Sequence, residues 1–165
     1  MKGNNEPLHA LLAPRKEVKK VGVVLITSNR GLCGGFNAAI IGKVYESIQK
    51  HQPANSAASV VTEFILIGKK GAAVCSRGQT VVADFPKLDL ASEVNEVVPA
   101  AKLMINDYLS GKYDKVMVAY TDFVSSSKQI PRVKQLLPME IDKTDQYLGI
   151  VGENPRTRAC ESDEI

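Results

Sequence analysis

The sequence predicts a three-layer α/β domain with a mostly parallel sheet of about five strands and an antiparallel strand at one edge. Strand-like and helix-like patterns alternate along the chain, which is the order expected of an α/β fold. The run VGVVLIT at residues 21–27 is continuously apolar and rich in β-branched residues, as expected of a strand buried on both faces. With 165 residues, the chain is long enough for one domain with a hydrophobic core.

The first predicted strand ends in a Gly-rich turn, SNRGLCGG, that leads into a helix. Apolar residues then recur at the spacing of one helical face, and this pattern ends near Lys50. Residues 60–67 (VVTEFILI) and 80–85 (TVVADF) have the composition of strands. The segment GKKGAAVCSRG between them predicts a short helix.

Ser92 is the expected N-cap of a second long helix, because a serine hydroxyl accepts hydrogen bonds from the unpaired N–H groups of a first turn. One face of this helix is apolar and consists of Val94, Val97, Val98, Ala101, Ile105 and Tyr108. Pro99 lies within the pattern, so the helix either kinks there or begins near it. The dipeptide Ser110-Gly111 ends the helix.

Two more strands are predicted at residues 114–123 and 129–137. Pro131 cannot donate a backbone hydrogen bond, so the last strand belongs at an edge of the sheet. The globular domain is therefore expected to span residues 18–140. Residues 1–17 are interpreted as the end of a helix, with Leu8, Leu11 and Leu12, followed by a charged linker. Residues 141–165 are expected to form an irregular tail.

Composition excludes several classes of function. The net charge of +3 comes entirely from residues 1–20, since residues 21–165 carry sixteen basic and sixteen acidic groups. A neutral fold with 5% aromatic residues and no Trp does not favour nucleic-acid binding. The chain has no apolar run of roughly 18 residues, which a membrane helix needs, and its start does not resemble a secretory signal. Membrane association is therefore expected only through partners.

No catalytic or metal-binding constellation stands out. The three cysteines, Cys33, Cys75 and Cys160, are widely spaced and far from both histidines, which disfavours a disulfide framework or a zinc site. Cys33 and Cys75 are interpreted as structural, and Ser125–Lys128 as a polar turn. Asp122 has no second carboxylate nearby in sequence for acid–base catalysis. The sequence therefore predicts no catalytic residue, no cofactor and no metal.

The Gly-rich turn is the main candidate for a binding site. It lies between a strand and a helix, where α/β folds bind phosphate groups. Its glycines at positions 31, 34 and 35 fit neither GxxxxGK[ST] nor GxGxxG. The favoured interpretation is a tight structural turn. The alternative is a standalone nucleotide- or phosphate-binding module that uses residues 30–35.

Four segments resemble the gamma subunit of F-type ATP synthases. The string ITSNRGLCGGFN at residues 26–37 is similar to the family signature TSDRGLCGG[FL]N. GKKG at residues 68–71, DKVMVAYTDF with the serines that follow it, and QLLP at residues 135–138 resemble further family segments in the same order. The resemblance therefore covers residues 18 to about 140.

The resemblance implies a Rossmann-like domain between two terminal helices that form an antiparallel coiled-coil shaft. It implies a non-catalytic rotor subunit that transmits torque between a membrane c-ring and the alpha–beta hexamer. The implied partners are the epsilon, alpha, beta and c-ring subunits. The absence of a regulatory dithiol insertion suggests a bacterial protein, peripheral on the cytoplasmic face of the inner membrane.

The resemblance also assigns residues. It implies a structural signature turn made of Ser28, Asn29, Arg30, Gly31, Leu32, Cys33, Gly34, Gly35, Phe36 and Asn37. Asn29 departs from the family, which usually has Asp at this position. Tyr147 is a candidate subunit contact, and the second shaft helix would be expected in the region of residues 141–165, where the sequence does not match it.

Overall fold

The computed structural model describes residues 9–30, 35–52, 59–86 and 93–140. In it, five strands form one sheet in the order β3-β2-β1-β4-β5. The strands are β1 (Lys20–Ile26), β2 (Val61–Ile67), β3 (Thr80–Phe85), β4 (Lys115–Ser125) and β5 (Lys128–Leu137). All neighbouring strands are parallel except β4 and β5, which are antiparallel. The predicted fold class is confirmed, and Pro131 lies on an edge strand as expected.

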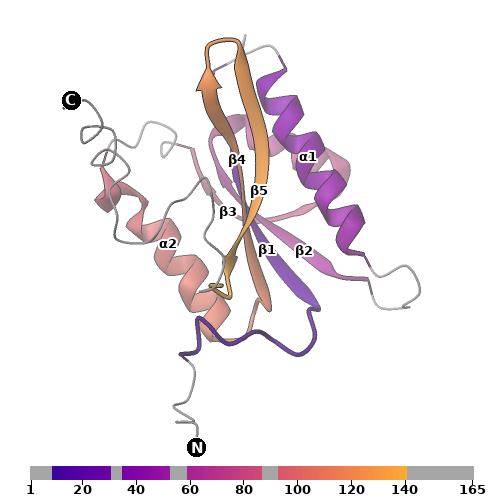
Figure 1. The fold of residues 1–165 in the computed structure, drawn as a ribbon, viewed down its shortest axis with the longest axis vertical. Coiled ribbons are helices and arrows are strands. Elements are labelled where there is room, and N and C mark those ends of the chain that lie inside the picture. Colours follow the sequence, from indigo (N-terminus) through magenta and orange to yellow (C-terminus); the bar gives the residue numbers. More distant parts are fainter. Residues whose placement is uncertain (1–8, 31–34, 53–58, 87–92, 141–165) are drawn as a thin grey trace, which may run out of the picture.

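Helices cover both faces of the sheet (Figure 1). Helix α1 (Phe36–His51) and the 3-10 helix η1 (Lys69–Arg77) pack on one face. Helix α2 (Val94–Leu109) packs on the other. Strands β1 and β2 supply buried side chains to both layers, because successive residues of a strand point to opposite faces. This is why the sequence of β1 is apolar without alternation.

The core is therefore divided by the sheet. On the α1 face it includes Leu25, Ile40, Val44, Phe64 and Leu66 among other residues. On the α2 face Val24, Ile65 and Ile67 form a smaller cluster, to which Met104 of α2 adds a partly buried side chain. A third cluster lies where α2 meets β4 and β5, and its members are Tyr108, Tyr113, Val116 and Leu137.

Helix α2 differs from its prediction at its start and along one side. Ser92 lies outside the described residues, and Glu93 is the N-cap, with its backbone N–H donating to Glu96 Oε2 at 2.9 Å. Pro99 lies inside the helix, which begins before it. The sheet covers only part of the predicted apolar face. Val94 is 80% exposed, whereas Tyr108 is completely buried.

The N-terminal segment crosses the end of α2 and meets the segment that follows β5. Residues 10–12 form a turn, in which the N–H groups of Leu12 and Ala13 donate to His9 O. Of the residues predicted to end a helix, Leu8 lies outside the described part of the chain. Leu11 packs against the cluster around Tyr108, and its carbonyl accepts a hydrogen bond from Met139 N at 2.8 Å.

Candidate functional site

The signature turn lies between the C-terminal end of β1 and the start of α1. Six of its ten residues are described; Gly31, Leu32, Cys33 and Gly34 lie outside the described residues. Ser28 and Asn37 close the turn through a pair of hydrogen bonds. The backbone N–H of Ser28 donates to Asn37 Oδ1 at 3.0 Å, and Asn37 Nδ2 donates to Ser28 Oγ at 2.9 Å. Two residues nine positions apart are thereby joined across the strand–helix connection.

Asn29 joins this turn to the ends of two other strands. Its Oδ1 accepts a hydrogen bond from Lys69 N at 2.7 Å, at the start of η1 after β2. Its Nδ2 donates to the carbonyl of Pro86, directly after β3. An aspartate could accept from Lys69 but could not donate to Pro86. The departure from the family signature therefore has a physical function in this chain, because only the amide satisfies both neighbours.

The GKKG segment after β2 fits closely against the end of β1. Gly68 has φ +87°, and a Cβ built on it would lie 2.0 Å from the carbonyl oxygen of Thr27. Thr27 Oγ1 lies 3.2 Å from Ile67 O and 3.1 Å from Gly68 O, so its buried hydroxyl donates toward this turn. Lys70 N donates to Ser28 O at 3.1 Å. The signature turn and GKKG thus form one contact, which we call the signature–GKKG contact.

The polar groups of this contact are largely used within the domain. Ser28, Asn29 and Asn37 all bind protein atoms through their side chains or backbone. Helix α1 has Gly35 at its N-cap and no side-chain capping bond. Within the described ranges no group of three or more His, Cys, Asp or Glu residues could hold a metal ion.

The other candidate residues are not assembled into one site. Asp122 accepts a hydrogen bond from Arg132 Nε at 2.9 Å and is therefore held in an ion pair on the β4–β5 hairpin. Ser125 and Ser127 contact each other near the tip of that hairpin. Cys75 is exposed on η1. Tyr147 lies outside the described residues.

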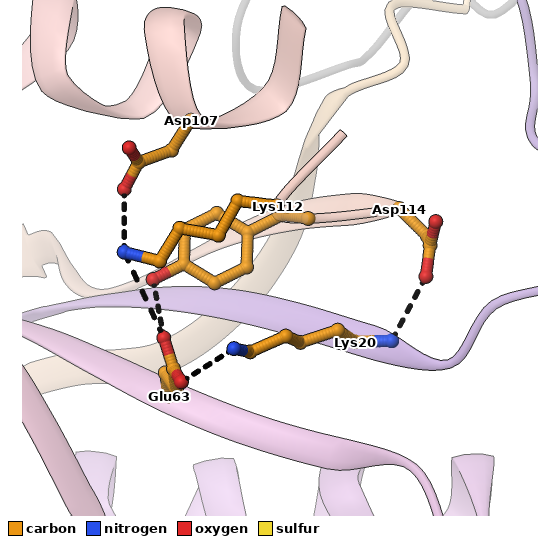
Figure 2. A network of polar contacts seen from close by, with 6 residues as sticks. Lys20, Glu63, Asp107, Lys112 and Asp114 are labelled. Carbon is orange, nitrogen blue, oxygen red and sulfur yellow. Dashed lines mark hydrogen bonds and ion pairs between the residues drawn. The ribbon is translucent and has the colours of Figure 1, made fainter. Parts of the chain in front are cut away.

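A second polar cluster lies at the opposite, N-terminal ends of the parallel strands (Figure 2). Glu63 of β2 is its centre, and it accepts a hydrogen bond from the Tyr113 hydroxyl at 2.8 Å. It forms an ion pair with Lys20 at 2.7 Å and a longer one with Lys112 at 3.9 Å. Lys112 also binds Asp107 of α2 at 2.9 Å. We call these five residues the Glu63 network.

The charges in the Glu63 network support one another. Burial opposes ionisation of Glu63, but the hydrogen bonds from Lys20 and Tyr113 outweigh it and hold the pKa of Glu63 below its ordinary value. Burial, together with the hydrogen bond to Glu63, raises the pKa of Tyr113 to about 12. The hydrogen bond to Asp107 raises the pKa of Lys112. Glu63 and Lys112 are therefore ionised at neutral pH, and Tyr113 is neutral.

Backbone contacts fix the Glu63 network to β1. Asp114 Oδ2 accepts hydrogen bonds from the N–H groups of Lys19 and Lys20, each at 2.9 Å. The ring of Tyr113 lies against β1 at Gly22, where an added Cβ would be 3.0 Å from Cδ2 of the ring. The α2–β4 connection is therefore locked onto β1 by both packing and charge. Sequence reasoning missed this cluster; its one signal is a lone Glu63 in the otherwise apolar strand VTEFILI.

Among the described residues, no helix has the length and apolar character needed to span a membrane. The folded part also has a defined point of connection to both flanks, because Leu11 and Met139 are hydrogen-bonded. Arg15 also connects the N-terminal flank to α2. Its guanidinium donates to Tyr108 O at 3.1 Å and lies 5.2 Å from the centre of the Tyr108 ring.

Known proteins match nearly the whole chain. A family model described as ATP synthase matches residues 1–164. The ATP synthase gamma chain of Nitrosomonas eutropha is 32% identical over 165 residues, which are 99% of this chain and 53% of that relative. The gamma chain of Variovorax paradoxus is 33% identical over 149 residues, 90% of this chain and 50% of that relative. The chain spans about half the length of these curated relatives.

Solved structures share the fold. A chain from the central stalk and c-ring structure of the Tetrahymena thermophila mitochondrial ATP synthase aligns with a TM-score of 0.51 and 24% identity, covering 75% of this chain and 52% of that one. A chain from the Euglena gracilis mitochondrial ATP synthase aligns with a TM-score of 0.52 and 17% identity, covering 83% and 44%. The resemblance at residues 26–37 is thus part of a match along the entire fold, and the chain belongs to the ATP synthase gamma-chain family.

Proposed function

We propose that this chain is the globular part of a rotor subunit, which transmits torque between a membrane c-ring and the alpha–beta hexamer and catalyses no reaction itself. The observation that carries this proposal is the meeting of the two flanks at Leu11 and Met139, whose backbones are joined by a hydrogen bond of 2.8 Å. A shaft of two antiparallel helices needs both flanks to leave the domain side by side. The hydrogen bond between Leu11 and Met139 supports such an arrangement.

Contacts around the flanks support the same role. Arg15 and Tyr108 are joined by a hydrogen bond and by a cation–π contact. The Tyr108 hydroxyl donates to Ala13 O at 3.1 Å. These contacts attach the N-terminal flank to α2 rather than to a loop. A part that carries torque needs such a firm attachment, because a loose one would absorb rotation instead of passing it on.

The signature turn is proposed to be structural. Side-chain groups of Ser28, Asn29 and Asn37 bind the domain itself, which leaves fewer groups for a phosphate ligand. A nucleotide titration of the purified chain tests this interpretation. We expect no saturable binding. Micromolar binding that is abolished by Gly34→Val would instead support a nucleotide- or phosphate-binding module that uses residues 30–35.

The proposed partners are the epsilon, alpha, beta and c-ring subunits. The proposed location is peripheral, on the cytoplasmic face of a bacterial inner membrane, with attachment through the c-ring rather than through lipid. No cofactor or metal is part of the proposal. The coiled-coil shaft that would turn inside the hexamer would be formed by the flanks, outside the described residues.

Native gel electrophoresis of membranes from the source cells, solubilised in mild detergent, tests the assignment. An antibody against this domain should detect a large complex that also contains the alpha and beta subunits. Deletion of the gene for the beta subunit provides the control and should shift the signal to smaller species. The proposal would be contradicted if the antibody detected only a free soluble chain while the intact synthase complex on the same gel did not contain it.

A further inference from the structure

A cavity of about 270 Å³ lies between the second half of α1 and the N-terminal half of the sheet. It is on the α1 face, and its walls include Val21 and Thr62, which are the sequence neighbours of Lys20 and Glu63. Its walls are mainly aliphatic. Val44 and Ile48 of α1 face Val21 and Val23 of β1, with Met117 of β4 at one side.

The cavity follows from the course of α1. The first half of this helix is packed tightly, and Ile40, Ile41 and Val44 are buried. In the last turns the face toward the sheet carries a smaller residue, Ser47, and the exposed His51. The apolar surface of the strands is therefore left incompletely filled at this end. A mainly aliphatic cavity of this kind favours an apolar guest.

The polar groups at the edge of the cavity differ in whether they bind other residues of the described chain. Gln52 is used by the backbone of Val60, with Nε2 donating to Val60 O and Oε1 accepting from Val60 N, both at 3.3 Å. His51 Nδ1 lies 2.7 Å from Ser47 O. Lys115, on β4, has no ion pair or hydrogen bond from its ammonium to any residue in the described ranges. It is half-buried and shares the α1 face with Met117.

We propose that this cavity binds a small amphipathic carboxylate, with its apolar tail among Val21, Val44 and Ile48 and its carboxylate on Lys115. The aliphatic walls favour an alkyl or aryl tail over a sugar or a nucleotide. Among the described lining residues Lys115 is the one lysine or arginine, and it favours a ligand with one negative charge, because a carboxylate on a half-buried ammonium forms a charge-assisted hydrogen bond. The site is independent of the rotor function and would act beside it.

Octanoate is a suitable probe. Isothermal titration of the purified 165-residue chain should give saturable binding of one octanoate, and two-dimensional amide NMR should show shifts concentrated on α1 and the start of β1. Octan-1-ol, with the same tail and no charge, should bind about tenfold more weakly, which corresponds to about 1.4 kcal/mol for the lost charge contact. Acetate, with the charge and almost no tail, should not bind measurably.

Matched variants separate the charge from the tail. Lys115→Gln should weaken octanoate binding about tenfold and leave octan-1-ol unchanged, whereas Lys115→Arg should restore octanoate. Ser47→Phe should fill the opening and weaken both ligands. Lys102→Gln is the control, because Lys102 is exposed on α2 at the opposite face. Circular dichroism and the urea midpoint establish that each variant is folded.

Two outcomes would overturn the proposal. One is the absence of saturable octanoate binding by a chain whose circular dichroism shows it to be folded. The other is equal binding of octanoate and octan-1-ol with no effect of Lys115→Gln, which would show a nonspecific apolar surface. Neither outcome bears on membership of the synthase complex, which the native gel tests separately.

Discussion

The two ends of the parallel strands are held together by different means. At the C-terminal end, the signature–GKKG contact uses neutral hydrogen bonds from side chains to backbone and the close approach of Gly68 to Thr27. At the N-terminal end, the Glu63 network uses charged side chains from three elements. The first depends on shape, and the second depends on charge as well as on the packing of Tyr113 against Gly22. We therefore expect the signature–GKKG contact to be sensitive to added atoms but not to pH, and the Glu63 network to be sensitive to pH.

The largest effect is expected from Gly68→Ala. The new Cβ would lie 2.0 Å from Thr27 O at a φ of +87°, so the backbone must move and the contact between β1 and η1 must open. We expect a loss of about 3 to 4 kcal/mol in the free energy of unfolding, measured by urea denaturation.

Gly78→Ala is the matched control. Gly78 also has a positive φ, +75°, but an added Cβ would meet nothing within 4 Å. Gly78→Ala should lower the free energy of unfolding by about 1 kcal/mol, which is the cost of placing a Cβ on a backbone with positive φ. Equal losses in the two variants would show that the close approach to Thr27 contributes nothing. If Gly68→Ala yields no folded protein while Gly78→Ala does, this result also shows that Gly68→Ala causes the larger loss of stability.

Glu63→Gln should have the next largest effect. The amide keeps an acceptor for Tyr113 but removes the charge that Lys20 and Lys112 face, at a site where Glu63 is only 13% exposed. We expect a loss of about 2 kcal/mol at neutral pH. Glu46→Gln is the control, because Glu46 also binds two lysines but lies on the surface of α1. It should leave the urea midpoint nearly unchanged.

The same variant tests the pH dependence. Because folding lowers the pKa of Glu63, its contribution is complete above the ordinary value of 4.5 and is lost as pH falls toward the folded pKa. Tyr113 behaves oppositely. Folding raises its pKa to about 12, so its contribution is present below 10 and is lost as pH rises through about 12. Urea midpoints across pH should therefore fall less steeply in acid for Glu63→Gln than for the unaltered chain.

The smallest of the three effects is expected from Asn29→Asp. The carboxylate can still accept from Lys69 N but cannot donate to Pro86 O, which would leave that carbonyl beside a negative charge. We expect a loss of about 1 kcal/mol at neutral pH, recovered in part in acid, where the protonated form donates. Asn95→Asp, in the first turn of α2, is the control and should cause no loss. A more stable Asn29→Asp variant would contradict the bridging role of the amide.

The signature turn and the Glu63 network also differ in whether they could be predicted from the sequence. Ser28, Asn29 and Asn37 lie close together in the sequence, so the string that contains them is visible as a motif, although the two partners of Asn29 lie after β2 and β3. Lys20, Glu63 and Asp107 are dispersed over the chain and meet only after the strands and α2 have taken their places. A motif records local contacts well. It records assembled clusters poorly, because no spacing in the sequence reflects their geometry.

The same limit applies to α2. Its apolar period predicted a helix, and the helix is present, but Val94 at 80% exposure shows that period alone does not say how much of a face the sheet will cover. The order of the strands in the sheet could not be predicted from the sequence pattern either. The position of β5 at an edge was predictable, because Pro131 carries a local chemical constraint.

The hydrogen bond between Leu11 and Met139 has a mechanical consequence. A domain tethered by one strand of chain can swivel about that tether, whereas one held at two adjacent points has lost this freedom. The guanidinium of Arg15 adds a further contact, because it binds the carbonyl of Tyr108 and lies over the Tyr108 ring. The N-terminal flank is therefore held both to the segment after β5 and to α2, and these contacts restrict its orientation relative to the sheet.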